Sequence, residues 1–280
     1  MRLEGVGRRY GPRGPWVLRE VGLVLPAGTL ARVTGGNGSG KSTLLRLLAG
    51  VDAPSAGRIT ARPPRTAYVP ERFPAALPLT ATGYLVHLGR VQGLTGRDAA
   101  ARAGEWLARF DATPYAGTPL AELSKGTSQK VAVAQALLAD PDLLVLDEAW
   151  TGLDTTARTE LDHAVRARVA AGGRVVFVDH DPRRLAGEAD AEYRVVEGGV
   201  RGPERRPRPA EPPRPRVRIG ASGGAPLPPG LPGAPAYAPA GSDAARLTVT
   251  VDATHSDTLL RALLDAGWHI EALTTEGVRV

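Results

Sequence analysis

The sequence predicts an α/β fold built around a parallel sheet. Four short runs are continuously apolar up to a polar or turn residue at the end, namely LARVT, TAYVP, LLVLD and VVFVD at residues 30–34, 66–70, 143–147 and 175–179. Helical patterns separate these runs along the chain. Strands without a polar face are typical of a parallel sheet that is covered on both sides. In such sheets functional groups gather at the carboxyl ends of the strands.

Composition predicts three regions: a domain over 1–200, a linker over 201–243 and a small module over 244–280. Residues 201–218 hold seven arginines against two glutamates, which is +5 of the net charge of +6. Residues 202–241 carry 12 of the 25 prolines. Such a segment buries too little apolar surface to offset the entropy of ordering it, so an extended linker is expected.

The sequence of the C-terminal module predicts a β-α-β arrangement. LTVTV alternates like a strand, SDTLLRALLDAG has helical spacing with a terminal glycine, and IEALTTEGVRV is strand material. About 35 residues are too few to be stable alone, so the module is expected to pack on something else.

The sequence lacks the features of secreted, thiolate-metal and membrane-spanning proteins. It has no cysteine, which leaves no disulfide and no thiolate metal site. Its first residues, MRLEGVGRRYGPRG, do not resemble a secretion signal, and no apolar run reaches the roughly 18 residues of a membrane span. We therefore expect a soluble, cytoplasmic protein.

The first apolar run leads into GGNGSGKST and then a helix. This matches G-x-x-x-x-G-K-[ST] in the strand–loop–helix context that a phosphate-binding loop requires. Lys41 is expected to reach the terminal phosphates and Ser42 to ligate Mg²⁺. The chain has 32 arginines and three lysines, yet position 41 is lysine, which a plain glycine-rich turn would not explain. The predicted nucleotide-binding residues are Gly35, Gly36, Asn37, Gly38, Ser39, Gly40, Lys41, Ser42 and Thr43.

Acidic and imidazole groups end two later runs. Asp147 and Glu148 follow LLVL, where they either terminate a strand or, beside the phosphate loop, supply a Mg²⁺ ligand and a base that polarises the attacking water. His180 follows VVFVD at the next strand end. A histidine there is often structural or solvated, but this one could also hydrogen-bond a γ-phosphate.

LSKGTSQK, residues 123–130, precedes the apolar run VAVAQALL. Ser124 and the following glycine can be no more than a helix cap. Nothing nearby in the sequence looks like a partner for this helix start.

In this order the motifs resemble those of the ATP-binding subunit of an ABC transporter, over about 70% of the chain. The resemblance implies a P-loop NTPase fold with a RecA-like parallel-sheet core. It also implies an N-terminal antiparallel β subdomain and a helical subdomain at about 73–135. ATP and Mg²⁺ are the implied cofactors.

The resemblance also implies residue roles. Tyr10 matches the aromatic residue that stacks on adenine, Asp154 lies in the D-loop, and His180 is the switch histidine. LSKGTSQK is the family signature, so Ser124, Lys125, Gly126 and Thr127 would contact ATP held by a partner subunit. A homodimer or a heterodimer with another ABC ATPase is therefore implied.

Some positions depart from the common family pattern. This chain has Lys125 and Thr127 where the family commonly has glycine and glutamine. It also has Ala149 in place of a proline, and Glu71 in place of the Q-loop glutamine. A carboxylate at position 71 can still ligate Mg²⁺. LSKG and YVPE resemble a bacterial exporter branch that serves drugs, antibiotics and polysaccharides.

The sequence thus predicts an ATPase that energises export by a separately encoded permease and lies peripherally on the cytoplasmic face of the membrane. The alternative is a soluble ABC ATPase that works without a permease, in regulation or on nucleic acid. Only the arginine-rich segment favours that alternative. A solvated tail explains the segment most simply, contact with anionic lipid comes next, and nucleic acid is an unlikely partner.

Overall fold

The computed structural model describes residues 1–73, 77–204, 216–223, 231, 235–239, 246–252 and 255–276. The chain divides into two compact units, Met1–Arg208 and Pro209–Val280. Within the described ranges no helix combines the length and the apolarity needed to cross a membrane.

The first unit is built on a six-stranded sheet with the order β5-β6-β7-β3-β8-β9. The first five strands run parallel, and β9 pairs antiparallel with β8. Their bounds are β5 Thr66–Val69, β6 Leu143–Asp147, β7 Arg174–Val178, β3 Leu30–Thr34, β8 Ala191–Val196 and β9 Gly199–Glu204. All four apolar runs of the sequence are therefore neighbours in one sheet, which confirms the predicted fold class.

A second, three-stranded antiparallel sheet has the order β2-β1-β4. It consists of β1 Arg2–Arg9, β2 Trp16–Val24 and β4 Ala56–Thr60. This is the N-terminal β subdomain that the sequence predicted.

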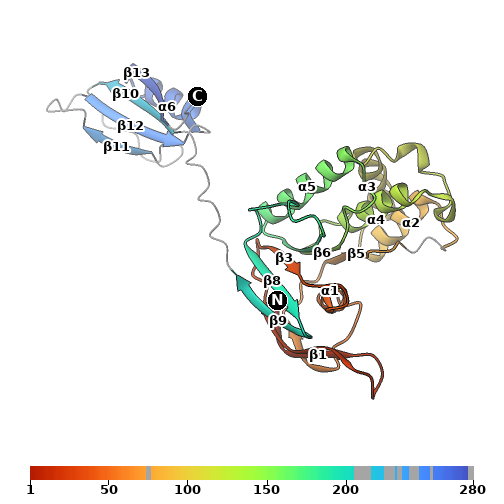
Figure 1. Ribbon diagram of the computed structural model, residues 1–280. Coiled ribbons are helices and arrows are strands. Elements are labelled where there is room, and N and C mark those ends of the chain that lie inside the picture. The colour runs from red at the N-terminus through yellow and green to blue at the C-terminus, as the bar shows by residue number, and fades with distance from the viewer. Residues whose placement is uncertain are drawn as a thin grey trace. The chain divides into compact units, whose positions relative to one another are not determined.

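α1 Lys41–Ala49 covers one face of the large sheet, and α4 Lys125–Leu137 and α5 Thr155–Ala170 cover the other (Figure 1). α2 Ala81–Val91 and α3 Gly96–Arg109 pack on each other and on α4, and short 3₁₀ turns follow at Thr113–Tyr115 and Leu120–Glu122. Leu143 and Val145 of β6 pack with α1 and the N-terminal sheet. Leu144 and Leu146 pack with α4 and α5. Both faces of the strand are buried, which is why its sequence shows no polar alternation.

The second unit is a four-stranded antiparallel sheet, order β11-β12-β10-β13, with one helix. Its elements are β10 Arg216–Ser222, β11 Ala236–Pro239, β12 Arg246–Asp252, α6 Ser256–Asp265 and β13 His269–Glu276. The succession β12, α6, β13 is the predicted β-α-β module. Leu259 and Leu263 of α6 share a core with Ile219, Val249 and Trp268.

The linker expected over 201–243 differs from the structure, because part of β9 and all of β10 and β11 lie in that range. β10 is an inner strand that pairs with both β12 and β13. Val217, Ile219 and Ala221 are buried, at alternate positions. Composition averaged over forty residues hid this short period-2 pattern. The remaining positions of the expected linker, 205–215, 224–230, 232–234 and 240–243, lie outside the described residues.

Candidate functional site

The phosphate loop, residues 35–43, joins the end of β3 to the start of α1. Gly35, Gly38 and Gly40 have φ angles of 147°, 74° and 107°, which favour glycine. A Cβ on Gly35 would lie 2.6 Å from the Val195 carbonyl oxygen. The sequence pattern is therefore required by the backbone path of this loop.

The loop is suited to an anion. Gly40 occupies the N-cap of α1 without a side-chain cap hydrogen bond, so the amides of the first turn are open to a phosphate. The Lys41 Nζ donates to the Gly35 and Gly36 carbonyls at 2.9 and 3.0 Å. Among the described residues, the buried Ser39 hydroxyl finds no hydrogen-bond partner. Gly36, Asn37 and Gly38 are exposed at the tip. These features fit the triphosphate that the motif predicts.

Asp147 lies at the end of β6 with 2% exposure. Burial raises the pKa of Asp147, and the charge of Glu71 acts in the same direction, whereas hydrogen bonds with Ser42 and Tyr68 oppose the rise. The Tyr68 hydroxyl donates to Asp147 Oδ2 at 3.2 Å. A buried carboxylate beside the Ser42 hydroxyl is a fitting pair of oxygen ligands for Mg²⁺, because a cation would offset the buried charge.

Sequence reasoning missed Tyr68. It lies on β5, one position before the end of the strand, and burial raises its pKa together with the neighbouring Asp147 charge. Its only signal in the sequence was its place in a strand that precedes Glu71. Glu71 itself is exposed just beyond the same strand.

Glu148 and His180 are in direct contact. The His180 Nε2 lies 2.6 Å from Glu148 Oε1. β6 and β7 are neighbours, so the residues that follow them meet at one edge of the sheet. Glu148 has a φ of 54°, and its amide donates to the Val178 carbonyl at 3.0 Å. This backbone conformation turns Glu148 away from the strand direction that Asp147 follows.

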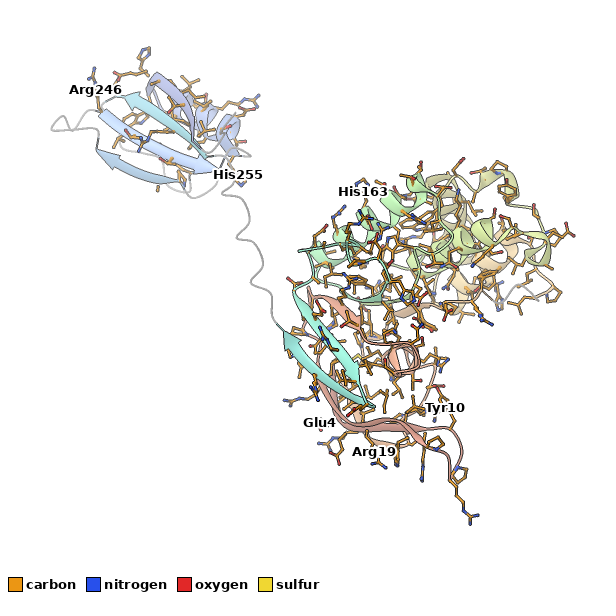
Figure 2. All side chains as sticks on the ribbon, in the orientation of Figure 1. Glu4, Tyr10, Arg19, His163, Arg246 and His255 are labelled. Atoms are coloured by element: carbon orange, nitrogen blue, oxygen red, sulfur yellow. The ribbon has the colours of Figure 1, made fainter. Side chains whose placement is uncertain are left out.

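Tyr10 lies beside α1 (Figure 2). Its hydroxyl contacts Thr43 Oγ1 at 3.3 Å and donates to Asp52 Oδ2 at 3.0 Å. The Arg8 guanidinium lies 4.7 Å from the centre of its ring. Tyr10 is 46% exposed, so polar contacts hold its hydroxyl while much of the residue is open to a ligand.

The signature segment begins α4. Ser124 Oγ accepts from the Thr127 amide at 3.1 Å and contacts Thr127 Oγ1 at 2.9 Å. A Cβ on Gly126 would lie 3.0 Å from the Gly152 carbonyl oxygen. Lys125 is exposed. Because α4 and α1 pack on opposite faces of the sheet, the helix start that Ser124 caps is not part of the phosphate loop's surroundings.

Comparison with known proteins agrees with this geometry. A family profile described as "ABC transporter" matches residues 18–151. The chain is 36% identical over 223 residues to the aliphatic sulfonates import ATP-binding protein SsuB 2 of Pseudomonas aeruginosa, covering 78% of each chain. The chain belongs to the ABC transporter ATP-binding proteins.

Two further likenesses support this assignment. The ABC ATPase is 38% identical over 169 residues to the zinc import ATP-binding protein ZnuC of Cereibacter sphaeroides, covering 59% of this chain and 67% of ZnuC. A solved structure of an ABC transporter ATP-binding subunit superposes with a TM-score of 0.66 at 25% identity, covering 72% of this chain and 88% of the other. The chain is therefore an ATPase that uses ATP with Mg²⁺.

The exporter branch suggested by LSKG and YVPE gains no support from these relatives. Both named relatives are import ATP-binding proteins. Two four-residue motifs are too short to outweigh identity over most of the chain.

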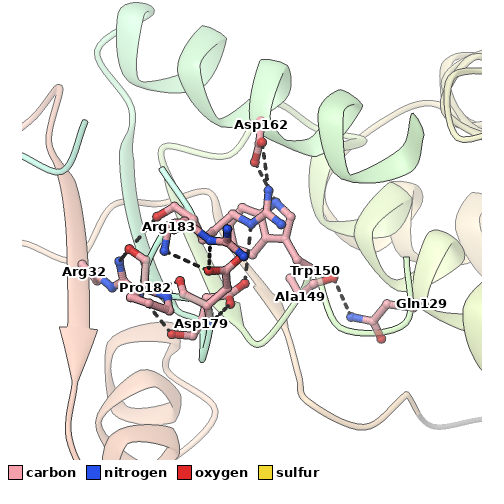
Figure 3. Close-up of polar contacts among 10 residues, drawn as sticks. Arg32, Gln129, Ala149, Trp150, Asp162, Asp179, Pro182 and Arg183 are labelled. Carbon is pink, nitrogen blue, oxygen red and sulfur yellow. Dashed lines mark hydrogen bonds and ion pairs between the residues drawn. The ribbon is translucent and has the colours of Figure 1, made fainter. Parts of the chain in front are cut away.

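The ABC ATPase also contains buried contacts that sequence reasoning missed (Figure 3). Gln129 Nε2 of α4 donates to the Ala149 carbonyl at 3.0 Å, next to Glu148. Trp150 Nε1 donates to Asp162 Oδ1 of α5 at 2.8 Å. Neither contact has a local sequence pattern, because the paired residues come from different elements.

Proposed function

We propose that this chain hydrolyses ATP in a composite site formed by two cassettes and thereby energises a separately encoded membrane permease. The observation that carries the proposal is the placement of the two nucleotide motifs on opposite faces of one sheet. The phosphate loop packs with the α1 face, whereas the signature helix α4 packs with the other face. A signature that contacts phosphate therefore needs the phosphate of another molecule.

In our proposal the phosphate loop binds ATP. Lys41 leaves its carbonyl contacts in the loop to bind the terminal phosphates, and Tyr10 stacks on the adenine. Ser42 and Asp147 would hold Mg²⁺, with Glu71 as a further ligand. Mg²⁺, when bound, supplies positive charge that offsets the charge developing on the phosphates.

Hydrolysis would depend on Glu148 and His180. Glu148 accepts a hydrogen bond from the attacking water and polarises it. His180, whose Nε2 lies 2.6 Å from Glu148 Oε1, would release Glu148 and donate to the γ-phosphate. Glu148 thus acts on the attacking water, and His180 acts on the negative charge of the γ-phosphate.

The partner cassette would close the site. Ser124 and the amides of Lys125, Gly126 and Thr127 would contact the γ-phosphate of the partner's ATP, and Asp154 would lie at the interface. A homodimer and a heterodimer both satisfy this arrangement. The subunit is proposed to lie peripherally on the cytoplasmic face of the membrane, and relatives named for import make import the favoured direction.

The test is the size of purified Glu148→Gln with and without Mg-ATP, measured by light scattering on a sizing column. Without the base, ATP should hold two copies together, and adding Ser124→Arg should abolish that dimer. Glu105→Gln is the control, because Glu105 is exposed on α3. A Glu148→Gln protein that binds ATP but stays monomeric would contradict the composite site. Co-purification without any membrane protein would instead support a soluble ABC ATPase that works without a permease.

A further inference from the structure

The segment that carries His180 passes over β3, where it contacts Arg32. It leaves β7 and reaches β8, and these two strands lie on either side of β3. We call residues 179–184 the switch loop. Arg32 of β3 pairs in register with Phe177, shortly before the loop begins.

The Arg32 guanidinium binds the backbone of the switch loop (Figure 3). It donates four hydrogen bonds to carbonyl oxygens, to Pro182 at 3.0 Å, Arg184 at 3.5 Å, Asp179 at 3.3 Å and Asp181 at 2.9 Å. The acceptors at positions 179 and 181 flank His180 directly. One side chain therefore fixes the backbone on both sides of the histidine.

These contacts suit arginine in particular. A guanidinium presents several N–H donors in a rigid plane, whereas a lysine ammonium is a compact charge that serves fewer acceptors at once. Two carbonyls accept from each terminal nitrogen of Arg32. Arginine is abundant throughout this chain, so the four hydrogen bonds, and not the residue type, distinguish Arg32.

A second arginine ties the far end of the loop to the rest of the site. Arg184 Nη1 lies 3.1 Å from Asp162 of α5, and its guanidinium lies 5.5 Å from the centre of the Trp150 ring. Trp150 follows Glu148 by two positions. The switch loop is thus held from β3 at one side and from the turn after Glu148 at the other.

We propose that Arg32 is a positioning residue that sets the distance between His180 and Glu148. This proposal rests on the proposed roles of those two residues in hydrolysis. Arg32 lies three positions before Gly35, so it connects the strand that carries the phosphate loop directly to the loop that carries His180.

The test is a double-mutant cycle between Arg32→Met and His180→Ala, read as kcat and KM for ATP in the full chain. Methionine keeps an unbranched apolar stem and removes the donors. We expect kcat to fall about 10- to 100-fold, the size expected for a small misplacement of a catalytic group. KM should change by less than about twofold, because the ATP-binding loop is intact. In the His180→Ala background Arg32→Met should have almost no further effect.

Arg174→Met is the matched control. Arg174 Nε donates to the Leu25 carbonyl at 2.9 Å, so it too links a strand to a distant backbone, but at the start of β7. We expect its kcat to stay near that of the wild type. Arg32→Lys should give an intermediate kcat, and it replaces Arg32→Met in the cycle if that variant is insoluble.

Wild-type kcat in Arg32→Met, or an equal loss in both backgrounds, would overturn the role of Arg32. Wild-type kcat in His180→Ala would overturn the proposed role of His180, and the role of Arg32 with it. The single variants therefore distinguish failure of this inference from failure of the proposed function.

Discussion

Lys130 of α4 forms an ion pair with Asp154, with 2.7 Å between Nζ and Oδ2. Asp154 also caps α5, since its Oδ1 accepts from the Ala157 amide at 2.8 Å. The helix that begins with the signature is therefore joined to the D-loop residue within the same chain. In the proposed composite site, a movement of α4 toward the partner's nucleotide would be passed to the turn that follows Glu148.

The two functions of Asp154 can be separated by substitution. Asp154→Ala removes both the cap and the ion pair and should lower the free energy of unfolding by about 1 kcal/mol. Asp154→Asn keeps a good cap and loses only a half-exposed ion pair, so it should lower the free energy by about 0.5 kcal/mol or less. Urea unfolding at neutral pH measures both values, and equal losses would show that the cap contributes nothing.

The same pair makes a prediction about pH. The hydrogen bond from Lys130 holds the pKa of Asp154 below its usual range. A depressed carboxyl pKa stabilises the fold above the ordinary value of about 3.9, and this stabilisation disappears as the pH falls through the folded pKa. The difference in stability between the wild type and Asp154→Asn should therefore shrink below about pH 4. A difference that stays constant down to acid pH would contradict the ion pair.

Asp147→Asn should remove a buried charge without weakening the nucleotide-free protein. Burial raises the pKa of Asp147, so its ionised form disfavours the fold once the pH exceeds the ordinary carboxyl value. The unfolding temperature of the apo variant should equal or exceed that of the wild type at neutral pH. In the wild type, Mg-ATP at 100 times its Kd should stabilise by about 2.7 kcal/mol.

The variant should lose most of that stabilisation because Mg²⁺ loses a charged ligand. Thermal unfolding with and without Mg-ATP compares the two proteins. If Asp147→Asn without nucleotide is less stable than the wild type but gains the same stabilisation from Mg-ATP, Asp147 is not a Mg²⁺ ligand.

Gly35→Ala should destabilise the phosphate loop. Gly35 has a φ of 147°, and the added Cβ would lie 2.6 Å from the Val195 carbonyl oxygen. Strain of this kind costs about 1–3 kcal/mol, and we expect ATP binding to weaken with it. Gly36→Ala is the stability control, since no atom lies within 4 Å of its added Cβ. Chemical unfolding and nucleotide titration compare the two, and equal stability would contradict the described backbone path.

Ile219→Ala should destabilise the C-terminal unit selectively. Ile219 is fully buried at 0% exposure in the inner strand β10. Truncating such a side chain costs about 2–5 kcal/mol. Limited proteolysis of the full chain should show faster cleavage within 216–276 and unchanged resistance of the ATPase unit. The exposed Arg218 supplies the control Arg218→Ala, and similar cleavage of both variants would argue against a packed unit around β10.

The chemistry of the site was predictable because its parts are contiguous in the sequence. Residues 35–43 carry the glycines, the lysine and the hydroxyls of the phosphate loop within nine positions. Asp147, Glu148 and His180 each follow an apolar strand directly. Parallel strands bring such ends together as a general property of the fold, so the sequence predicted that these residues lie at one edge of the sheet. The direct contact between Glu148 and His180 was not predicted.

The supporting contacts were not predictable in this way. Arg32 donates to the Asp179 carbonyl although the two residues are 147 positions apart in the sequence. Tyr68 and Asp147, which also form a hydrogen bond, are 79 positions apart. No spacing or periodicity marks such pairs. They exist because β5 and β6, and likewise β3 and β7, were placed side by side by the strand order of the sheet.

The α/β class, the nucleotide chemistry and the family of this protein follow from short sequence patterns that backbone geometry and phosphate binding require. The residues that hold the switch loop, and the position of β10 between β12 and β13, depend on how distant segments pack. Val217 and Ile219 follow a period-2 pattern too short to predict a core strand alone, and the pairing of β12 and β13 on either side of β10 is what makes them core residues. Long-range pairing is decided by the packing of the whole chain, which no local pattern records.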